Sequence, residues 1–90
     1  MKIKILIPVY NDWQSVFKLI ENINNLMIGS KDEISILIVN DASNHDRQDN
    51  NLDYENINSI KILNMKFNQG HSRCIAIGLK YIHEKEDFDY

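Results

Sequence analysis

Three short polar segments of the chain could carry chemistry, because each follows a predicted strand or precedes a predicted helix. They cover residues 8–12, 40–43 and 68–73. In a parallel α/β sheet the carboxyl ends of the strands meet at one edge, and ligands bind in the crevice outside that edge. We therefore expect the three segments to lie together and to form one binding site.

The first two segments offer groups that bind a base or a ribose. Asp41 follows a buried-type strand, where its carboxylate can accept an N–H or O–H with little competition from water. Aspartates also cap turns, so both roles stay open for this residue. Pro8 ends the hydrogen-bond ladder of its strand and fixes φ, which leaves the strand-end backbone free to face a flat ligand. Tyr10 packs either against a nucleobase or against the following helix.

The third segment has the composition of a phosphate site. Asn68 and Gly70 precede a helix whose free N–H groups and dipole favour an anion, and Arg73 adds positive charge one turn later. A single glycine indicates no more than a turn. The spacing lacks both Gly-x-Gly-x-x-Gly and a Walker lysine, which excludes the common dinucleotide-binding and P-loop classes.

The other residues of reactive type predict no catalytic or metal centre. His45, His71 and His83 lack the spacing of metal ligands, and of the three only His71 stands at the expected phosphate end. The single cysteine, Cys74, excludes an internal disulfide and suits a reducing compartment. On a helix it is expected to be a small buried hydrophobe and not a reactive thiol. The sequence contains no Ser-His-Asp or Cys-His arrangement.

Composition narrows the class of protein and its partners. Ninety residues with 43% hydrophobic and 26% charged side chains make one small globular domain. The net charge of −3 and the scattered basic residues argue against nucleic acid or an anionic membrane as a partner. The apolar runs at 3–9 and 34–39 are too short to span a membrane, and the first is not a signal peptide. We expect a cytoplasmic protein, or one at the cytoplasmic membrane face if a longer parent has membrane segments.

The first half of the chain predicts a strand, a helix and a second strand. Residues 3–9 and 34–39 are rich in isoleucine and valine, which is typical of strands buried on both faces. Between them, Asn11 or Asp12 is a natural N-cap and Gly29 a stop for a helix. The apolar residues at helical spacing in this helix are Trp13, Val16, Phe17, Ile20, Ile23 and Met27.

The second half predicts a third strand at 59–64, a helix at 71–85 and the start of a fourth strand at Phe88 and Tyr90. The polar stretch between the second and third strands is expected to be a short helix or turn plus a loop, with Ser43 and Asp46 spaced like a capping box. The main apolar stripe of the last helix is Ile75, Leu79 and Ile82, widened by Cys74 and Ile77. This order predicts one partial α/β domain over residues 1–90, with a doubly wound parallel sheet.

Four segments together resemble the amino-terminal half of family 2 glycosyltransferases, which are inverting nucleotide-sugar enzymes of the GT-A fold. The order and separation of the segments are also those of the family, and the resemblance covers nearly the whole chain. The segments at 68–73 and 76–79 are similar to members that resemble polyprenyl-phosphate sugar transferases. The segments are Ile7-Pro8-Val9-Tyr10-Asn11-Asp12-Trp13, Ile38-Val39-Asn40-Asp41-Ala42-Ser43, Asn68-Gln69-Gly70-His71-Ser72-Arg73 and Ala76-Ile77-Gly78-Leu79.

The resemblance implies a role for each matching residue and a Rossmann-like fold. The backbone at Pro8 and Val9, with Tyr10 beside it, would border the nucleobase and ribose. Asp12 stands where the family has an acid near the nucleoside. Asp41 matches the second acid of the family's Asp-Asp-Gly-Ser and would accept the uracil N–H of a UDP-sugar. The residues that would line the nucleotide and pyrophosphate side are Asn68, Gly70 and Arg73.

The chain departs from the family pattern in two ways. Asn40 replaces the first acid of that motif, and Ala42 replaces its glycine. The family's Asp-x-Asp, which holds Mg²⁺ or Mn²⁺ on the diphosphate, lies at the end of the fourth strand, and the catalytic base and acceptor-binding half lie further on. Asp87 and Asp89 have the Asp-x-Asp spacing, but they flank the start of that strand and are rejected as the metal site.

We therefore expect no catalytic and no metal-binding residue in this chain, and no sugar transfer by the chain alone. The resemblance implies a parent enzyme that moves a sugar from a UDP- or GDP-sugar to a lipid phosphate or a glycan. In the strand order 3-2-1-4 that it implies, an incomplete fourth strand leaves residues 3–9 as an apolar edge. Such an edge pairs with other chains, so we expect self-association.

A rival interpretation is a non-catalytic α/β nucleotide-binding or interaction module, for instance a flavodoxin-like or receiver-like domain. A receiver needs a phosphoacceptor aspartate after its third strand, but the third strand here ends near Asn64 with no acid beside it. This weakens the receiver interpretation and leaves a simple binding or assembly module open.

Overall fold

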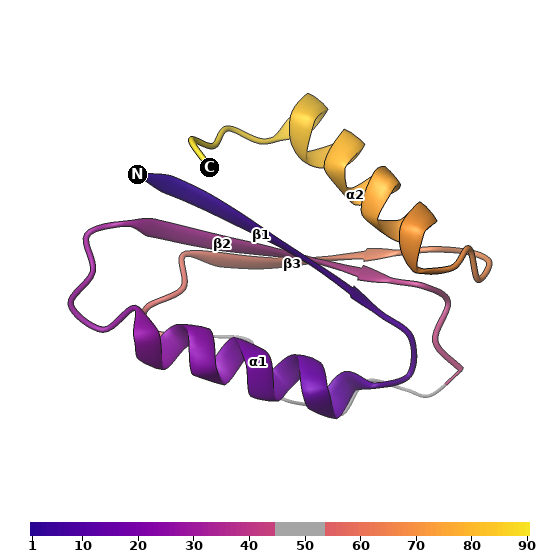
Figure 1. Cartoon of the computed structure of the whole chain (residues 1–90), viewed down its shortest axis with the longest axis horizontal. Helices are drawn as coiled ribbons and strands as arrows, with labels where there is room; N and C mark the ends of the chain where they lie inside the picture. Colours follow the sequence, from indigo (N-terminus) through magenta and orange to yellow (C-terminus); the bar gives the residue numbers. More distant parts are fainter. Residues whose placement is uncertain (45–53) are drawn as a thin grey trace.

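Three parallel strands form one sheet with a helix on each face (Figure 1). The structure is a computed structural model that describes residues 1–44 and 54–90. The elements are β1 (Lys2–Val9), α1 (Trp13–Leu26), β2 (Glu33–Asn40), β3 (Ser59–Asn64) and α2 (His71–Lys85). The predicted α/β class and parallel sheet are confirmed. The capping-box residue Asp46 and His45 lie outside the described residues, as does most of the predicted polar helix or turn.

The sheet order is β1-β2-β3, which makes β2 the central strand. The register pairs Val9 with Asn40 and Asn40 with Asn64, so the carboxyl ends of the three strands are level with one another. This alignment is what brings the segments after β1 and β2 to the same edge. We call it the carboxyl edge of the sheet.

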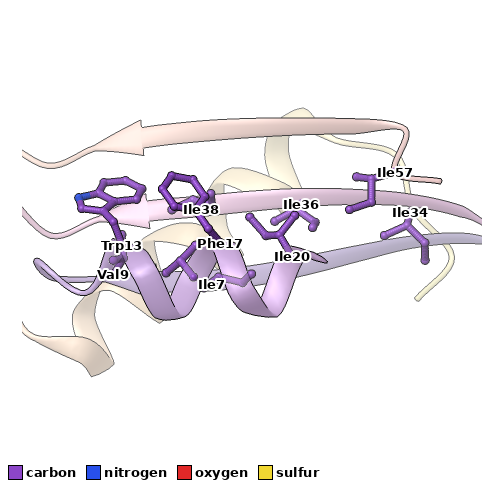
Figure 2. Close-up of a cluster of buried hydrophobic side chains, with 10 residues drawn as sticks. Ile7, Val9, Trp13, Phe17, Ile20, Ile34, Ile36, Ile38 and Ile57 are labelled. Carbon is purple, nitrogen blue, oxygen red and sulfur yellow. The ribbon is translucent and has the colours of Figure 1, made fainter. Parts of the chain in front are cut away.

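The larger part of the hydrophobic core lies between α1 and the sheet (Figure 2). Alternate residues of each strand point to this face. On α1 the rings of Trp13 and Phe17 stack with their centroids 6.0 Å apart. The helix begins as predicted, because the Asp12 side chain accepts a hydrogen bond from the Ser15 N–H. The buried members of the cluster are Ile7, Val9, Trp13, Val16, Phe17, Ile20, Ile34, Ile36, Ile38 and Ile57.

The face of α2 that packs on the sheet differs from the predicted stripe. Cys74, Gly78 and Ile82 are buried, whereas Ile75 is 39% and Leu79 57% exposed. The reason is Gly78, where the helix comes closest to the sheet. A Cβ atom there would lie 2.5 Å from Leu6 Cδ1. A prediction from large apolar residues ignores glycines. It therefore places the buried face of α2 part of a turn away from its true position.

The prediction that β1 is buried on both faces is wrong for its first half, because residues 3–6 are only partly buried. Lys4 and Lys61 point to the α2 face, beyond the part of it that α2 covers. Glu86, which follows α2, lies over this region. Its Oε1 atom is 2.9 Å from Lys61 Nζ and 3.6 Å from Lys4 Nζ. The Lys4 side chain is only 9% exposed and that of Glu86 13%, so the chain buries a charged group here and neutralises it with the residue at the end of the helix.

The predicted start of a fourth strand is present as hydrogen bonds at the free side of β1. The Tyr90 N–H donates to the Lys2 carbonyl over 3.0 Å, and the Lys4 N–H donates to the Tyr90 carbonyl over 2.9 Å. This pair of bonds is that of a parallel strand opposite Ile3. The two chain ends accordingly lie side by side in Figure 1.

The same bonds leave fewer backbone groups on the free side of β1 to pair with another chain. The backbone groups of alternate residues point to this side, and those of Lys2 and the Lys4 N–H are already paired. Pro8 has no N–H to offer. Leu6 is left as the donor on this side of β1, so the expected self-association stays a prediction and would depend on the backbone around Leu6.

Candidate functional site

An open cavity lies at the carboxyl end of β1. Its volume is about 500 Å³. Four residues predicted for the site line it, namely Pro8, Val9, Tyr10 and Asp12, and His71 joins them from the start of α2. The residues at the end of β1 thus border an open space.

A second cavity, of about 540 Å³, surrounds the amino end of α2. It is lined by Gln69, Gly70, His71, Ser72 and Arg73, so His71 borders both cavities. The N-cap residue of this helix, Gly70, makes no side-chain capping bond, and the first turn of the helix has no acidic residue. Arg73 Nη1 donates to the Gln69 side chain over 3.0 Å. This end of α2 has the charge and the donors that an anionic group requires.

Asp41 is buried at the junction of β2 and the turn before α2. The residue is 4% exposed. Oδ1 accepts the Gln69 N–H over 2.6 Å, and Oδ2 accepts the Gly70 N–H over 2.9 Å. Asn68 lines neither cavity, and its side chain donates to the Asp41 carbonyl over 3.3 Å. The sequence predicted that Asp41 and Asn68 belong to the site, but it gave no sign that Asn68 binds the Asp41 carbonyl or that the Asp41 side chain binds the two residues after Asn68.

The electrostatics of Asp41 follow from these contacts. Burial alone would raise the pKa of its carboxyl group. The Gln69 N–H, the Cys74 thiol and the Gly70 N–H outweigh burial, so the pKa is lowered. Burial and the Asp41 carboxylate in turn raise the pKa of Cys74 to about 11. Cys74 is therefore a protonated, fully buried donor, as expected of an unreactive thiol.

The turns after β1 and β2 are tied together by side-chain hydrogen bonds that the sequence did not predict. The Asn11 N–H donates to Ser43 Oγ over 2.9 Å, and the Asn44 N–H donates to Asn11 Oδ1 over 2.7 Å. Asn44 Nδ2 also donates to the Tyr10 hydroxyl over 3.1 Å. Tyr10 is 42% exposed. Its ring is thus held at the opening of the β1 cavity by its hydroxyl and does not pack into the core.

Asn40 and Ala42, the two residues that depart from the family motif, each have a distinct structural feature. Asn40 Nδ2 donates to Asn64 Oδ1 over 3.0 Å, and Asn40 Oδ1 accepts the hydroxyl of Ser43 over 2.6 Å. Two aligned strand ends are therefore joined by an amide pair. Ala42 has a φ of 55°, which is the left-handed region. A glycine at this position would adopt it without steric cost.

Replacing Ala42 with glycine should raise the free energy of unfolding by about 1 kcal/mol, because the relief of a left-handed alanine exceeds the entropy that glycine adds to the unfolded chain. Urea unfolding measures the change. The same substitution at Ala76, an exposed position inside α2, is the matched control and should lower the stability by about 1 kcal/mol. If both variants lose stability equally, the left-handed conformation at Ala42 is contradicted.

The described residues do not fit a divalent cation. Among residues 1–44 and 54–90, no group of three or more histidine, cysteine, aspartate or glutamate side chains is placed to hold a metal ion. Asp87 Oδ2 lies 3.1 Å from Lys2 Nζ, and Asp89 Oδ2 accepts the Lys2 N–H over 2.8 Å. Both acids thus lie at the amino end of β1, away from the two cavities.

Comparison with known proteins identifies the family. A family model described as "Glycosyl transferase family 2" matches residues 4–85, a range that contains β1 to α2 almost entirely and all three polar segments. No curated protein and no solved structure matches the chain. In the part of the chain that the structure describes, no helix is both long and apolar enough to cross a membrane. Because the family match spans most of the sequence, the chain belongs to glycosyl transferase family 2.

Proposed function

We propose that this chain binds the nucleotide part of a UDP- or GDP-sugar at the carboxyl edge of its sheet. Membership of family 2 assigns glycosyl transfer as the general role. The observation that carries the proposal is the pair of cavities that meet at His71. One is bordered by strand-end backbone and an aromatic ring, and the other by a helix amino end with an arginine.

In this proposal the base and ribose occupy the cavity at the end of β1. The backbone at Pro8 and Val9 borders the base, and the Tyr10 ring, held by Asn44, packs against it. Asp12 uses Oδ1 to cap α1, over 3.3 Å to the Ser15 N–H. In the proposal its other carboxylate oxygen accepts a ribose hydroxyl.

The diphosphate occupies the cavity at the amino end of α2. The first N–H groups of the helix and its dipole attract the negative charge. Arg73 supplies a full positive charge in the same cavity, and its planar group suits bidentate contact with phosphate oxygens. Gly70, with a φ of 85°, makes the turn that leads into this end of α2.

The remaining chemistry is assigned to other parts of a complete enzyme. Inverting transfer to a lipid phosphate or a glycan needs a base that activates the acceptor, and Mg²⁺ or Mn²⁺ would offset the charge of the leaving diphosphate. We propose that such a parent enzyme supplies both from residues other than those of this site. We also propose that it works in the cytoplasm or at the cytoplasmic face of a membrane.

Calorimetric titration of the chain with UDP, GDP and FMN tests the proposal. UDP or GDP should bind, and Arg73→Gln should weaken the binding at least about tenfold, since a hydrogen bond from a charged group is worth about 1.5–3 kcal/mol. Lys80→Gln removes the same charge from an exposed position further along α2 and should change the affinity less than about twofold. Tight binding of FMN with no binding of UDP or GDP would support the non-catalytic module instead.

A further inference from the structure

We infer that Asn44 is a positioning residue for the base, because its side chain holds the Tyr10 ring at the opening of the β1 cavity. That Tyr10 contacts a base rests on the proposed function, whereas the support of Tyr10 by Asn44 is a property of the chain without ligand. Asn44 itself lines neither of the two cavities.

The Tyr10 ring needs a support because it stands outside the core. The residue is 42% exposed and belongs to neither hydrophobic cluster, so packing does not fix the ring. An exposed side chain of this kind populates several staggered rotamers. The hydrogen bond of 3.1 Å from Asn44 Nδ2 to the Tyr10 hydroxyl holds the far end of the ring and selects one of them.

Asn44 can act as a support because its own backbone is tied to the turn after β1. Its N–H donates to Asn11 Oδ1 over 2.7 Å, and the Asn11 N–H donates to Ser43 Oγ over 2.9 Å. With the bond to Tyr10, three hydrogen bonds join the consecutive residues Tyr10 and Asn11 to the consecutive residues Ser43 and Asn44. We call this set of bonds the turn clamp.

Ser43 connects the turn clamp to the ends of two strands. Its hydroxyl donates to Asn40 Oδ1 over 2.6 Å, and its N–H donates to the same oxygen over 3.2 Å. Asn40 is the last residue of β2, and its Nδ2 atom donates to Asn64 Oδ1 at the end of β3 over 3.0 Å. The support of the Tyr10 ring therefore leads back to the sheet and not only to a loop.

The turn clamp also lies where the backbone needs external contacts. Asn11 has a φ of 65° and Ala42, the residue before Ser43, has a φ of 55°. Left-handed conformations are costly for residues other than glycine and persist where the surrounding structure holds them. The bonds at Asn11 and Ser43 hold both turns, and so they fix the place from which Asn44 reaches Tyr10.

This arrangement makes one part of a nucleotide depend on Asn44. Tyr10 lines the cavity assigned to the base, whereas Arg73 lines the cavity assigned to the diphosphate. Loss of the Asn44 amide should therefore weaken a nucleoside diphosphate and leave inorganic pyrophosphate unaffected. If Asn44 contacted the base directly, its loss would weaken the nucleotide even in a chain that lacks the Tyr10 hydroxyl.

The test compares wild type with Asn44→Ala, Tyr10→Phe and the double variant. Asn44→Ala removes the amide but keeps the N–H that binds Asn11, and Tyr10→Phe removes the hydroxyl but keeps the ring. Asn22→Ala, at an exposed position of α1, is the control for the loss of an amide. NMR titrations with pyrophosphate and with UDP or GDP, whichever wild type binds more tightly, give the affinities. Three-bond coupling constants give the rotamer of the side chain at position 10 without any ligand.

We expect Asn44→Ala and Tyr10→Phe each to weaken the nucleotide about threefold, as suits one exposed hydrogen bond between neutral groups. The double variant should bind no more weakly than either single variant, because both remove the same bond. Pyrophosphate binding should not change. The couplings should indicate one rotamer in wild type and Asn22→Ala, and an average of rotamers in the other variants.

Unchanged nucleotide binding in Asn44→Ala, equal weakening of nucleotide and pyrophosphate, or additive losses in the double variant would overturn the inference. Couplings in Asn44→Ala that match wild type would overturn it on their own, because that readout needs no ligand. If wild type binds neither UDP nor GDP, the proposed function fails, and the couplings still decide whether Asn44 holds the Tyr10 ring.

Discussion

Gly78→Val is expected to lower the free energy of unfolding by about 3 kcal/mol, the upper end of the usual cost of overpacking a core. A Cβ atom at Gly78 would lie 2.5 Å from Leu6 Cδ1 and 3.1 Å from Val39 Cγ2. Val39 is fully buried on the central strand and cannot move aside. The helix would have to lift from the sheet, which would also separate Cys74 from Asp41. Urea unfolding followed by the fluorescence of Trp13, on the other face of the sheet, measures the loss.

Two further variants show whether close approach is the cause. Lys80→Val places the same side chain at an exposed position of α2, where only helix propensity acts, and should cost less than about 1 kcal/mol. Gly78→Ala should fall between the two, because alanine recovers about 1 kcal/mol of helix propensity. Equal stability of wild type and Gly78→Val would contradict the packing of α2 on Leu6 and Val39.

Glu86→Gln should lower the stability by about 2 kcal/mol at neutral pH, because it removes the partner of the nearly buried Lys4 ammonium group. The hydrogen bond from Lys61 is the main cause that lowers the pKa of Glu86 below its ordinary value of 4.5. A carboxyl group with a lowered pKa stabilises the fold above its ordinary pKa, and this contribution is lost as the pH falls through the lowered value. The difference between wild type and Glu86→Gln should therefore be complete at pH 7 and should shrink as the pH falls below 4.5 and then through the lowered pKa of Glu86.

Urea unfolding at several pH values measures this difference, and Glu84→Gln is the matched control on the exposed end of α2. The Lys4 N–H, which donates to Tyr90, should exchange faster with solvent in Glu86→Gln, because the segment after α2 is less firmly held. If the two glutamine variants lose the same stability with the same pH dependence, Glu86 has no special role.

The elements of the fold were predictable because each depends on local patterns. Runs of isoleucine and valine mark β1 and β2, and the change to a helical period at Trp13 marks α1. The three strands and two helices are confirmed within about one residue at each end. The rotation of α2 was not predictable from apolar residues, because the closest contact belongs to Gly78, which adds no hydrophobicity.

The candidate site was predictable in part for the same reason. Pro8 and Tyr10 mark the end of a strand, and both line the cavity at the end of β1. The direction of Asp41 depends on where the main chain of Gln69 and Gly70 passes, and this follows only from packing α2 on the sheet. No spacing in the sequence reports that contact.

The bonds between Tyr90 and β1 have a practical consequence for protein engineering. Tyr90 already takes the place of a parallel strand opposite Ile3. Residues joined to Tyr90 would be led along β1 toward Pro8, with alternate side chains turned toward the two helices. A peptide tag fused there would enter the sheet instead of hanging free in solvent. A fusion partner should therefore begin with several strand-forming residues of alternating polarity, or with a proline that turns it away at once.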